Sequence, residues 1–116
     1  ERMIKTFGSR PSGLLACIGP SISQKHYEVG NEVADQFAFW FADTPAVCMK
    51  NKKTGKTHID LWEANRQLLL RMGVHTSNIE IGNLCTYNNP DLFYSARRDG
   101  LESGRFATGI MLTYER

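Results

Sequence analysis

Residues 46–73 read AVCMKNKKTGKTHIDLWEANRQLLLRMG, and this stretch carries the clearest local signals in the chain. Residues 46–49 and 57–59 flank a basic loop that contains Gly55, which predicts a β-hairpin. The residues that follow have apolar side chains at helical spacing, and this stripe consists of Leu61, Ala64, Leu68 and Met72. A hairpin that leads directly into an amphipathic helix indicates a fold built from both strands and helices.

Single residues mark the beginning and the end of this helix. Asp60 is suited to be its N-cap, and Glu63, three residues later, completes a capping box. Ile59 and Ala64 occupy the positions of a hydrophobic staple. Gly73 is suited to end the helix, because glycine adopts the left-handed conformation that closes a last turn.

On the N-terminal side, the pattern predicts two more helices and one strand. Apolar residues within 3–7 lie on one side of a helix that Gly8 caps. The apolar run 14–18 is typical of a buried strand. Residues 31–41 are expected to form a helix with Asn31 as its N-cap. Since the chain begins inside a helix, we expect it to be a piece of a longer protein.

The end of the second helix is unusually aromatic, with Phe37, Phe39, Trp40 and Phe41 within one turn and a half. Packing in a core or an interface explains such a cluster most simply. The alternative is a small non-enzymatic module whose aromatic helix binds a partner through an exposed apolar patch.

On the C-terminal side, Ile79 and Ile81 alternate with polar residues, which predicts a strand with one covered face. Residues 97–104 are polar and typical of a loop, and the apolar run 110–112 predicts a final strand. The succession of helices and strands over 1–116 predicts a single α+β domain of mixed α/β layers, in which mixed sheets pack with helices.

Composition narrows the classes of function. The formal net charge of +2 is too small to indicate nucleic acid or membrane partners. No apolar run approaches the length of a membrane-spanning helix. Cys17, Cys48 and Cys85 are an odd number and far apart, which favours free thiols in a reducing compartment, and the cytoplasm is the expected location. The oligomeric state is left open.

Local motifs do not support a phosphate loop or a metal site. Gly55-Lys56-Thr57 matches the end of a phosphate-loop motif, but Lys50 stands where its first glycine is required. The histidines and cysteines have no spacing that favours tetrahedral zinc. His58 is expected to face solvent and His75 to lie in an exposed loop, whereas His26 is hard to place. Cys17 and Cys48 are expected in the core, and Cys85 is expected to end a strand near a pocket, with a structural role preferred over a catalytic one.

The segment 85–108 combines aromatic residues, a hydroxyl group and three arginines among glycines. These residue types suit a site for phosphate or carboxylate, and its candidates are Tyr87, Ser95, Arg97, Arg98 and Arg105. The alternative is a structural Arg–Asp network, formed by the run Arg97-Arg98-Asp99, that pins a loop to the sheet. The residue types alone favour the network.

Three blocks of this chain resemble one protein family. Cys85-Thr86-Tyr87, followed by LFYSARRDG at 92–100 and Ser103-Gly104-Arg105, is similar to the closing signature of the bacterial laccase-domain family. The blocks IGPSI at 18–22 with YEVG at 27–30, and IDLWEANRQLL at 59–69, match further motifs of that family in the same order. Ala96, Ser103 and Phe106 depart from the usual tyrosine, threonine and methionine of the signature.

This resemblance implies a fold related to cytotoxic necrotizing factor-type cysteine hydrolases, and phosphorolysis and deamination of purine nucleosides. It also implies zinc held by two histidines and a cysteine in motifs that this chain lacks, so its own histidines and cysteines are not expected to be metal ligands. Copper-dependent oxidation of polyphenols is the alternative activity. The chain thus resembles the C-terminal half of the family fold, and without an N-terminal metal-binding half we expect it to be inactive. In the full-length protein, the three arginines are the first residues to test against phosphate, and Arg98→Ala is expected to impair phosphorolysis while leaving the fold intact.

Overall fold

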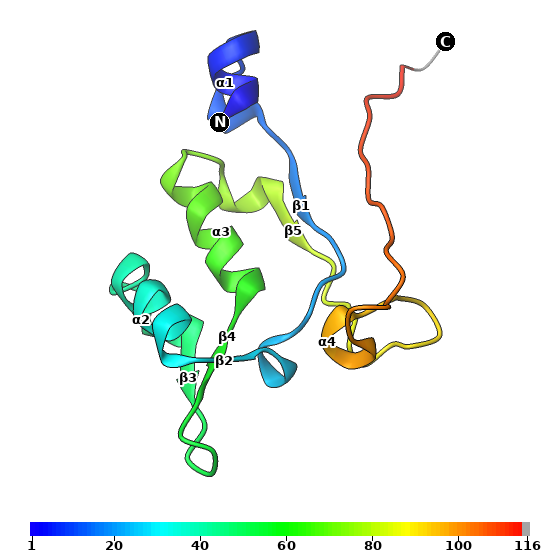
Figure 1. The fold of residues 1–116 in the computed structure, drawn as a ribbon. Helices are drawn as coiled ribbons and strands as arrows, with labels where there is room; N and C mark the ends of the chain where they lie inside the picture. Colours follow the sequence, from blue (N-terminus) through cyan, green and yellow to red (C-terminus); the bar gives the residue numbers. More distant parts are fainter. Residues whose placement is uncertain (115–116) are drawn as a thin grey trace.

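The computed structural model describes residues 1–114, which form short strands and helices arranged around two small sheets (Figure 1). In chain order, the helices and strands are α1 (Arg2–Phe7), β1 (Ala16–Ile18), β2 (Glu28–Val29), α2 (Asn31–Trp40), β3 (Cys48–Lys50), β4 (Thr57–Ile59), α3 (Leu61–Arg71), β5 (Ile79–Ile81) and α4 (Ala96–Asp99). The structure confirms the expected mixed α/β architecture, with one parallel and one antiparallel sheet among the described residues in place of sheets that are each mixed.

The first sheet is antiparallel and has the strand order β2-β4-β3. Its β3–β4 hairpin is the one predicted from the sequence, with Cys48 opposite Ile59 and Lys50 opposite Thr57. Helix α2 packs against β3 and β4. The core lies between these elements and contains Val29, Ala34, Phe41, Val47, Ile59 and Ala64, of which Val47 and Ile59 are fully buried.

Asp60 caps helix α3 as its sequence predicts, but Glu63 does not complete the capping box, because its carboxylate accepts from Arg66 and Gln67 while the Asp60 N–H donates to Val47. The Asp60 carboxylate accepts a hydrogen bond from the backbone N–H of Glu63 at 3.0 Å. The helix ends near Gly73, which has a φ of +92°. Arg71, in its last turn, reaches across to α2, where it donates to the carbonyl oxygen of Trp40 at 2.8 Å and pairs with Asp43. This side chain therefore ties the C-terminal ends of the two helices together.

The second sheet is a parallel pair of β1 and β5, with Ala16 opposite Ile79 and Ile18 opposite Ile81. Both strands contact α3, so this helix connects the two sheets. Both strands were predicted. The prediction that residues 14–18 are buried was wrong, because Leu15 and Cys17 are exposed. A two-stranded sheet with a single helix beside it has too few neighbours to cover both of its faces.

Three further predictions about local structure were wrong. Asn31 is the first residue of α2, and Gly30 occupies the N-cap position. Residues 96–99, expected mainly as loop, form the short helix α4, because Ser95 caps its first turn. Residues 110–112 form no strand and are exposed, since no neighbouring strand lies beside them in the part of the chain that the structure describes.

None of the helices described by the structure has the length and apolar character that a bilayer crossing requires.

Candidate functional site

A hollow of about 320 Å³ lies where the segment after β1 meets the region around α4, and it is called the polar hollow for the hydroxyl and guanidinium groups set in its mainly apolar lining. Hydroxyl groups, aromatic rings and one guanidinium group surround it. The lining residues are Pro20, Ser21, Ile22, Tyr27, Thr86, Tyr94, Ser95, Ala96, Arg97 and Phe106.

Ser21 is held rigidly at one wall of this hollow. Its backbone N–H donates to Leu84, and its carbonyl oxygen accepts from Thr86, each at 3.2 Å, so the β1–β5 pairing continues past the ends of both strands. The indole N–H of Trp62 donates to the Ser21 hydroxyl at 2.6 Å. Helix α3 therefore orients the Ser21 hydroxyl through Trp62.

The opposite wall is built around the first turn of α4. The hydroxyl of Ser95 accepts a hydrogen bond from the backbone N–H of Arg98 at 3.4 Å, and the Asp99 carboxylate accepts from the backbone N–H of Ser95 at 3.3 Å. Ser95 is buried. These reciprocal bonds are those of a capping box in a very short helix, with Asp99 one position later than usual.

Arg98 holds the loop that leads to α4. Its guanidinium group donates to the carbonyl oxygens of Thr86, Tyr87 and Phe93 at 2.9–3.0 Å and makes a two-pronged bond with Asp99 at 2.8 Å. The bond from Arg98 lowers the pKa of Asp99 below its ordinary value. This arrangement corresponds to the structural Arg–Asp network that the sequence offered as an alternative to an anion site.

Arg97 differs from Arg98 because most of its donors have no protein partner among residues 1–114. Its Nη1 donates to the carbonyl oxygen of Glu28 at 3.0 Å, and the guanidinium carbon lies 5.1 Å from the centre of the Tyr27 ring. The side chain is exposed and lines the hollow. Arg97 is therefore the arginine of this segment best placed to meet a ligand anion.

The remaining candidates lie outside the lining. Arg105 donates to the carbonyl oxygens of Ser103 and Gly104. The Tyr87 ring stacks on His26 with 4.5 Å between ring centres, and His26 Nε2 is buried without a partner within residues 1–114. Of the five residues predicted from the sequence, the structure brings Ser95 and Arg97 together at the hollow and places Arg98 behind it.

Sequence reasoning missed most of the other lining residues, among them Ser21, Tyr27 and Tyr94. The first two belong to blocks that were quoted for their resemblance, but no local pattern connects them with α4. Gly104 explains the position of Tyr94, because a Cβ at this glycine would lie 2.7 Å from the tyrosine ring. Only glycine at this position leaves the ring where it lines the hollow.

Cys85 is buried, which agrees with the structural role preferred for it from the sequence. Burial alone would raise the pKa of its thiol, but hydrogen bonds from Ser23, including the Ser23 N–H at 3.3 Å, and from the N–H groups of Asn88 and Tyr87 lower it below the ordinary value. Its companion Cys48 is partly buried, and burial raises the pKa of that thiol.

The histidines and carboxylates do not assemble into a metal site within the described part of the chain. Among residues 1–114, no three His, Cys, Asp or Glu side chains lie close enough together to hold a metal ion. His58, expected to face solvent, is instead largely buried, with Nδ1 2.8 Å from the Gln24 carbonyl oxygen and Nε2 3.2 Å from Glu28. His75 is exposed as predicted. The residues present therefore do not fit a zinc or copper centre.

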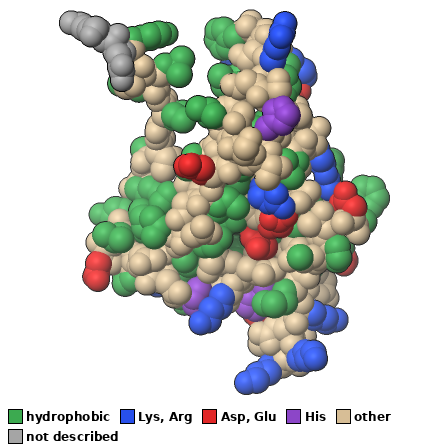
Figure 2. All heavy atoms as spheres, turned by 180° about the vertical axis from the view of Figure 1, so that it is seen from behind, with side chains coloured by type: hydrophobic (Ala, Val, Ile, Leu, Met, Phe, Trp, Pro, Cys, Tyr) green, Lys and Arg blue, Asp and Glu red, His purple; other side chains and the backbone are tan. Residues whose placement is uncertain are grey.

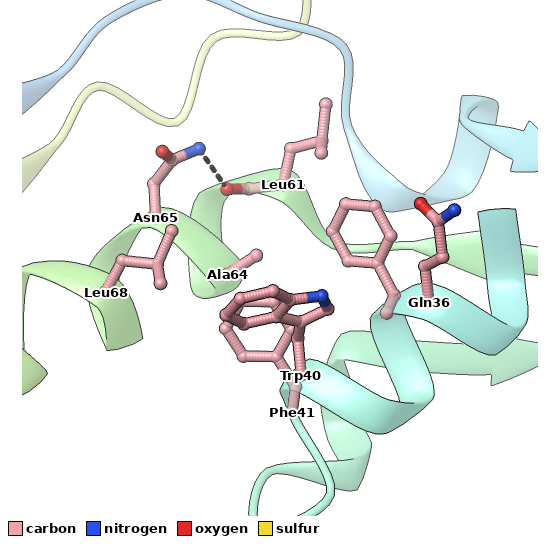
Figure 3. A pocket seen from close by; sticks show the side chains of 8 residues that line it. Gln36, Trp40, Phe41, Leu61, Ala64, Asn65 and Leu68 are labelled. Atoms are coloured by element: carbon pink, nitrogen blue, oxygen red, sulfur yellow. Dashed lines mark hydrogen bonds between the residues drawn. The ribbon is translucent and has the colours of Figure 1, made fainter.

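A second hollow of about 370 Å³ lies between α2 and α3 and is mostly apolar (Figure 3). Phe41 forms its buried side, and Trp40 lies across it with 63% of its surface exposed. Asn65 lies at the edge and donates to the Leu61 carbonyl oxygen at 2.8 Å. Of the four aromatic residues predicted for a core or an interface, Phe41 is buried and Phe37 packs against the core, whereas Phe39 and Trp40 are exposed.

Comparison with known proteins relates this geometry to one family. The family model described as multi-copper polyphenol oxidoreductase laccase matches residues 1–113. A protein of Bacteroides thetaiotaomicron named purine nucleoside phosphorylase is 48% identical over 96% of this chain and 41% of its own length. A protein from an unknown prokaryotic organism named adenosine deaminase RL5 is 41% identical over 89% of this chain and 39% of its own length.

Solved structures agree with these matches. The YfiH protein of Bacillus licheniformis superposes with a TM-score of 0.78 at 35% identity, over 85% of this chain and 38% of that chain. YlmD of Geobacillus stearothermophilus superposes with a TM-score of 0.75 at 33% identity, over 84% of this chain and 36% of that chain. The chain thus spans about two fifths of the length of the proteins it matches.

Proposed function

This chain belongs to the multi-copper polyphenol oxidoreductase laccase family, and we propose that it is part of a longer enzyme that cleaves purine nucleosides with phosphate and deaminates adenosine. The names of its relatives, purine nucleoside phosphorylase and adenosine deaminase, support this proposal. Phosphorolysis joins a phosphate oxygen to C1′ of the ribose while the bond from C1′ to the purine nitrogen breaks and its electron pair leaves with the base.

The lining of the polar hollow indicates which residues of this chain would bind the substrates. Phosphorolysis requires a cation near the phosphate and a surface against which a purine ring can stack. Arg97 supplies uncommitted guanidinium donors, and Tyr27, Tyr94 and Phe106 supply aromatic rings at the same hollow. Ser21 and Ser95 add hydroxyl groups that are held in place by neighbouring bonds. We assign Arg97 to phosphate and treat Arg98 as the residue that positions the loop below it.

The metal belongs to a part of the enzyme other than residues 1–114 in this proposal, because no group of suitable ligands forms there. The family resemblance implies zinc, and copper is the alternative that the family description suggests. We therefore derive no chemical step of this chain through a metal. The chain by itself is expected to show no turnover.

The test uses the longer protein that contains this chain and follows release of hypoxanthine from inosine at varied phosphate concentration. We expect Arg97→Ala to lower kcat/KM for phosphate by roughly 10- to 100-fold, because a charge-assisted hydrogen bond contributes about 1.5–3 kcal/mol. Arg105→Ala is the matched control, since Arg105 does not line the hollow, and it is expected to leave the phosphate dependence unchanged.

Three outcomes would contradict parts of this proposal. Unchanged kinetics of Arg97→Ala would remove Arg97 from the phosphate site. Equal losses in Arg97→Ala and Arg105→Ala would show that the hollow has no special role. Absence of both hypoxanthine from inosine and ammonia from adenosine, with copper-dependent oxidation of a phenol in their place, would favour the alternative activity.

A further inference from the structure

Strand β1 has an edge without a partner in the described part of the chain. In the observed register, Ile18 accepts a hydrogen bond from Gly82 at 2.9 Å, so Ile18 directs its backbone groups toward β5. In a parallel pair, alternate residues bond to the neighbour. The N–H and carbonyl groups of Cys17 therefore point away from β5, to the side where no other described strand lies. Such an edge is a template for another strand.

The C-terminal segment 106–114 has the composition of a strand but no strand partner within residues 1–114. Ile110, Met111 and Leu112 are more than 80% exposed. Phe106, Thr108, Gly109 and Ile110 line a groove, whereas Met111 and Leu112 do not. Figure 2 shows the segment as a column that stands apart from the body of the molecule.

The free edge of β1 and this segment face each other across one groove of about 870 Å³. Residues 15–21 form one wall and residues 106–110 form most of the other, and β5 contributes no lining residue. The Thr108 methyl group lies 3.7 Å from the position of a Cβ on Gly19, so the walls meet at that end. Figure 1 shows the backbone of this segment running beside β1, with which it forms no strand pair in the described part of the chain.

The proteins that this chain matches are much longer than the chain. The Bacillus licheniformis structure superposes on 85% of this chain but only 38% of its own length is covered. The remaining three fifths of that fold must pack somewhere, and the groove presents an unpaired strand edge and exposed apolar side chains at one place. Neither the polar hollow nor the apolar hollow between α2 and α3 presents a strand edge.

We propose that this groove binds a β-strand that belongs to the part of the family fold outside residues 1–116. The strand hydrogen-bonds to the free edge of β1 at Cys17, and Phe106, Thr108 and Ile110 cover it from the other side. The groove shares Pro20, Ser21 and Phe106 with the polar hollow, so the added strand also closes the open side of the candidate site. This inference depends on membership of the family and not on the proposed activity.

The test is assembly of two pieces. This chain is expressed together with the part of the Bacteroides thetaiotaomicron relative that lies outside the 111 matched residues, and an affinity tag on that part captures the complex. We expect equimolar recovery. Amide hydrogen exchange at Cys17 is expected to slow by about 100-fold or more relative to the isolated chain, because that N–H gains a partner. No catalytic readout is involved, so the result is independent of the proposed function.

Two variants at exposed positions serve as a matched pair. Ile110→Lys places a charge in the groove and is expected to lower recovery about tenfold, because an unpaired charge must then be buried. Met111→Lys has the same chemistry at a residue that does not line the groove and is expected to retain recovery. Both side chains are more than 80% exposed, so neither change disturbs the fold of the chain itself.

Each of the other outcomes overturns the proposal. No complex, or a complex in which Cys17 exchanges as fast as in the free chain, would place the missing part elsewhere. Equal effects of the two lysine variants would show that the groove face is not special. A homodimer of this chain with Cys17 protected, detected by sedimentation, would make a second copy the occupant.

Discussion

The two sheets of this molecule differ in how completely their residues are covered. The antiparallel sheet β2-β4-β3 is covered by α2, and Ile59 in β4 and Val47 just before β3 have no exposed surface. The parallel pair β1–β5 has α3 beside it, yet Cys17 and Leu15 at its start remain exposed. The covered sheet is made from residues 28–59, which are close in sequence, whereas the open pair joins strands 63 positions apart.

This difference shows which part of the chain is self-sufficient. A hairpin and two adjacent helices bury their apolar faces against one another with short connections, so this region closes by itself. A parallel pair requires a crossover and helices or strands on both sides before its faces are covered. The open region keeps apolar side chains uncovered within residues 1–114, and the strand proposed above would cover them.

The largest effect is expected in the covered region. Ile59→Ala should lower the free energy of unfolding by about 2–5 kcal/mol, because it removes a fully buried side chain and leaves a cavity. Ile110→Ala is the matched control in the open region, and its effect should stay within about 0.5 kcal/mol. Urea denaturation of the 116-residue chain measures both. Comparable losses would mean that the two regions are equally packed in solution.

A smaller effect is expected at the junction between the hairpin and α3. Asp60→Ala removes the acceptor for the Glu63 N–H and should cost about 1 kcal/mol, whereas Asp60→Asn keeps an acceptor and should cost a few tenths. The same denaturation experiment measures the difference. If both variants are as stable as the unchanged chain, the cap does not contribute to the stability of the covered region.

The smallest effect concerns acid. Hydrogen bonds from Arg66 to Glu63 lower the pKa of that carboxyl group, against the opposing effect of burial. A carboxyl group whose pKa is lowered by folding stabilises the folded state above its unfolded pKa, and this contribution is lost as the pH falls through the folded pKa. The melting temperature should therefore decline below about pH 4.

Glu63→Gln should weaken this acid dependence, because glutamine does not titrate. Glu102→Gln is the control, since Glu102 is exposed and has no ion-pair partner within residues 1–114. Thermal melts between pH 3 and 6, in steps of about half a unit, separate the two variants. If Glu63→Gln and the unchanged chain show the same dependence of melting temperature on pH, the Glu63–Arg66 ion pair does not contribute to acid sensitivity.

The candidate site was predictable only in part. Ser95 and Arg97 were found because residue types that bind anions cluster in one segment of the sequence. Ser21 and Tyr27 were not found, since only long-range contacts bring them to the hollow: Ser21 pairs with Cys85, and the Tyr27 ring lies against the Arg97 guanidinium group. Arg98 was placed among the anion candidates because sequence does not reveal that its donors end on backbone carbonyl groups.

The sequence by itself determined the hairpin, the capped helix α3, the left-handed turn at Gly8 and the α+β class, because each depends on residues a few positions apart. Only the tertiary structure decided that the Cys17 thiol is exposed, that His58 is largely covered and that residues 110–112 have no strand beside them within residues 1–114. Burial is a property of what surrounds a residue. An apolar run has the same composition whether or not another part of the fold is present to cover it.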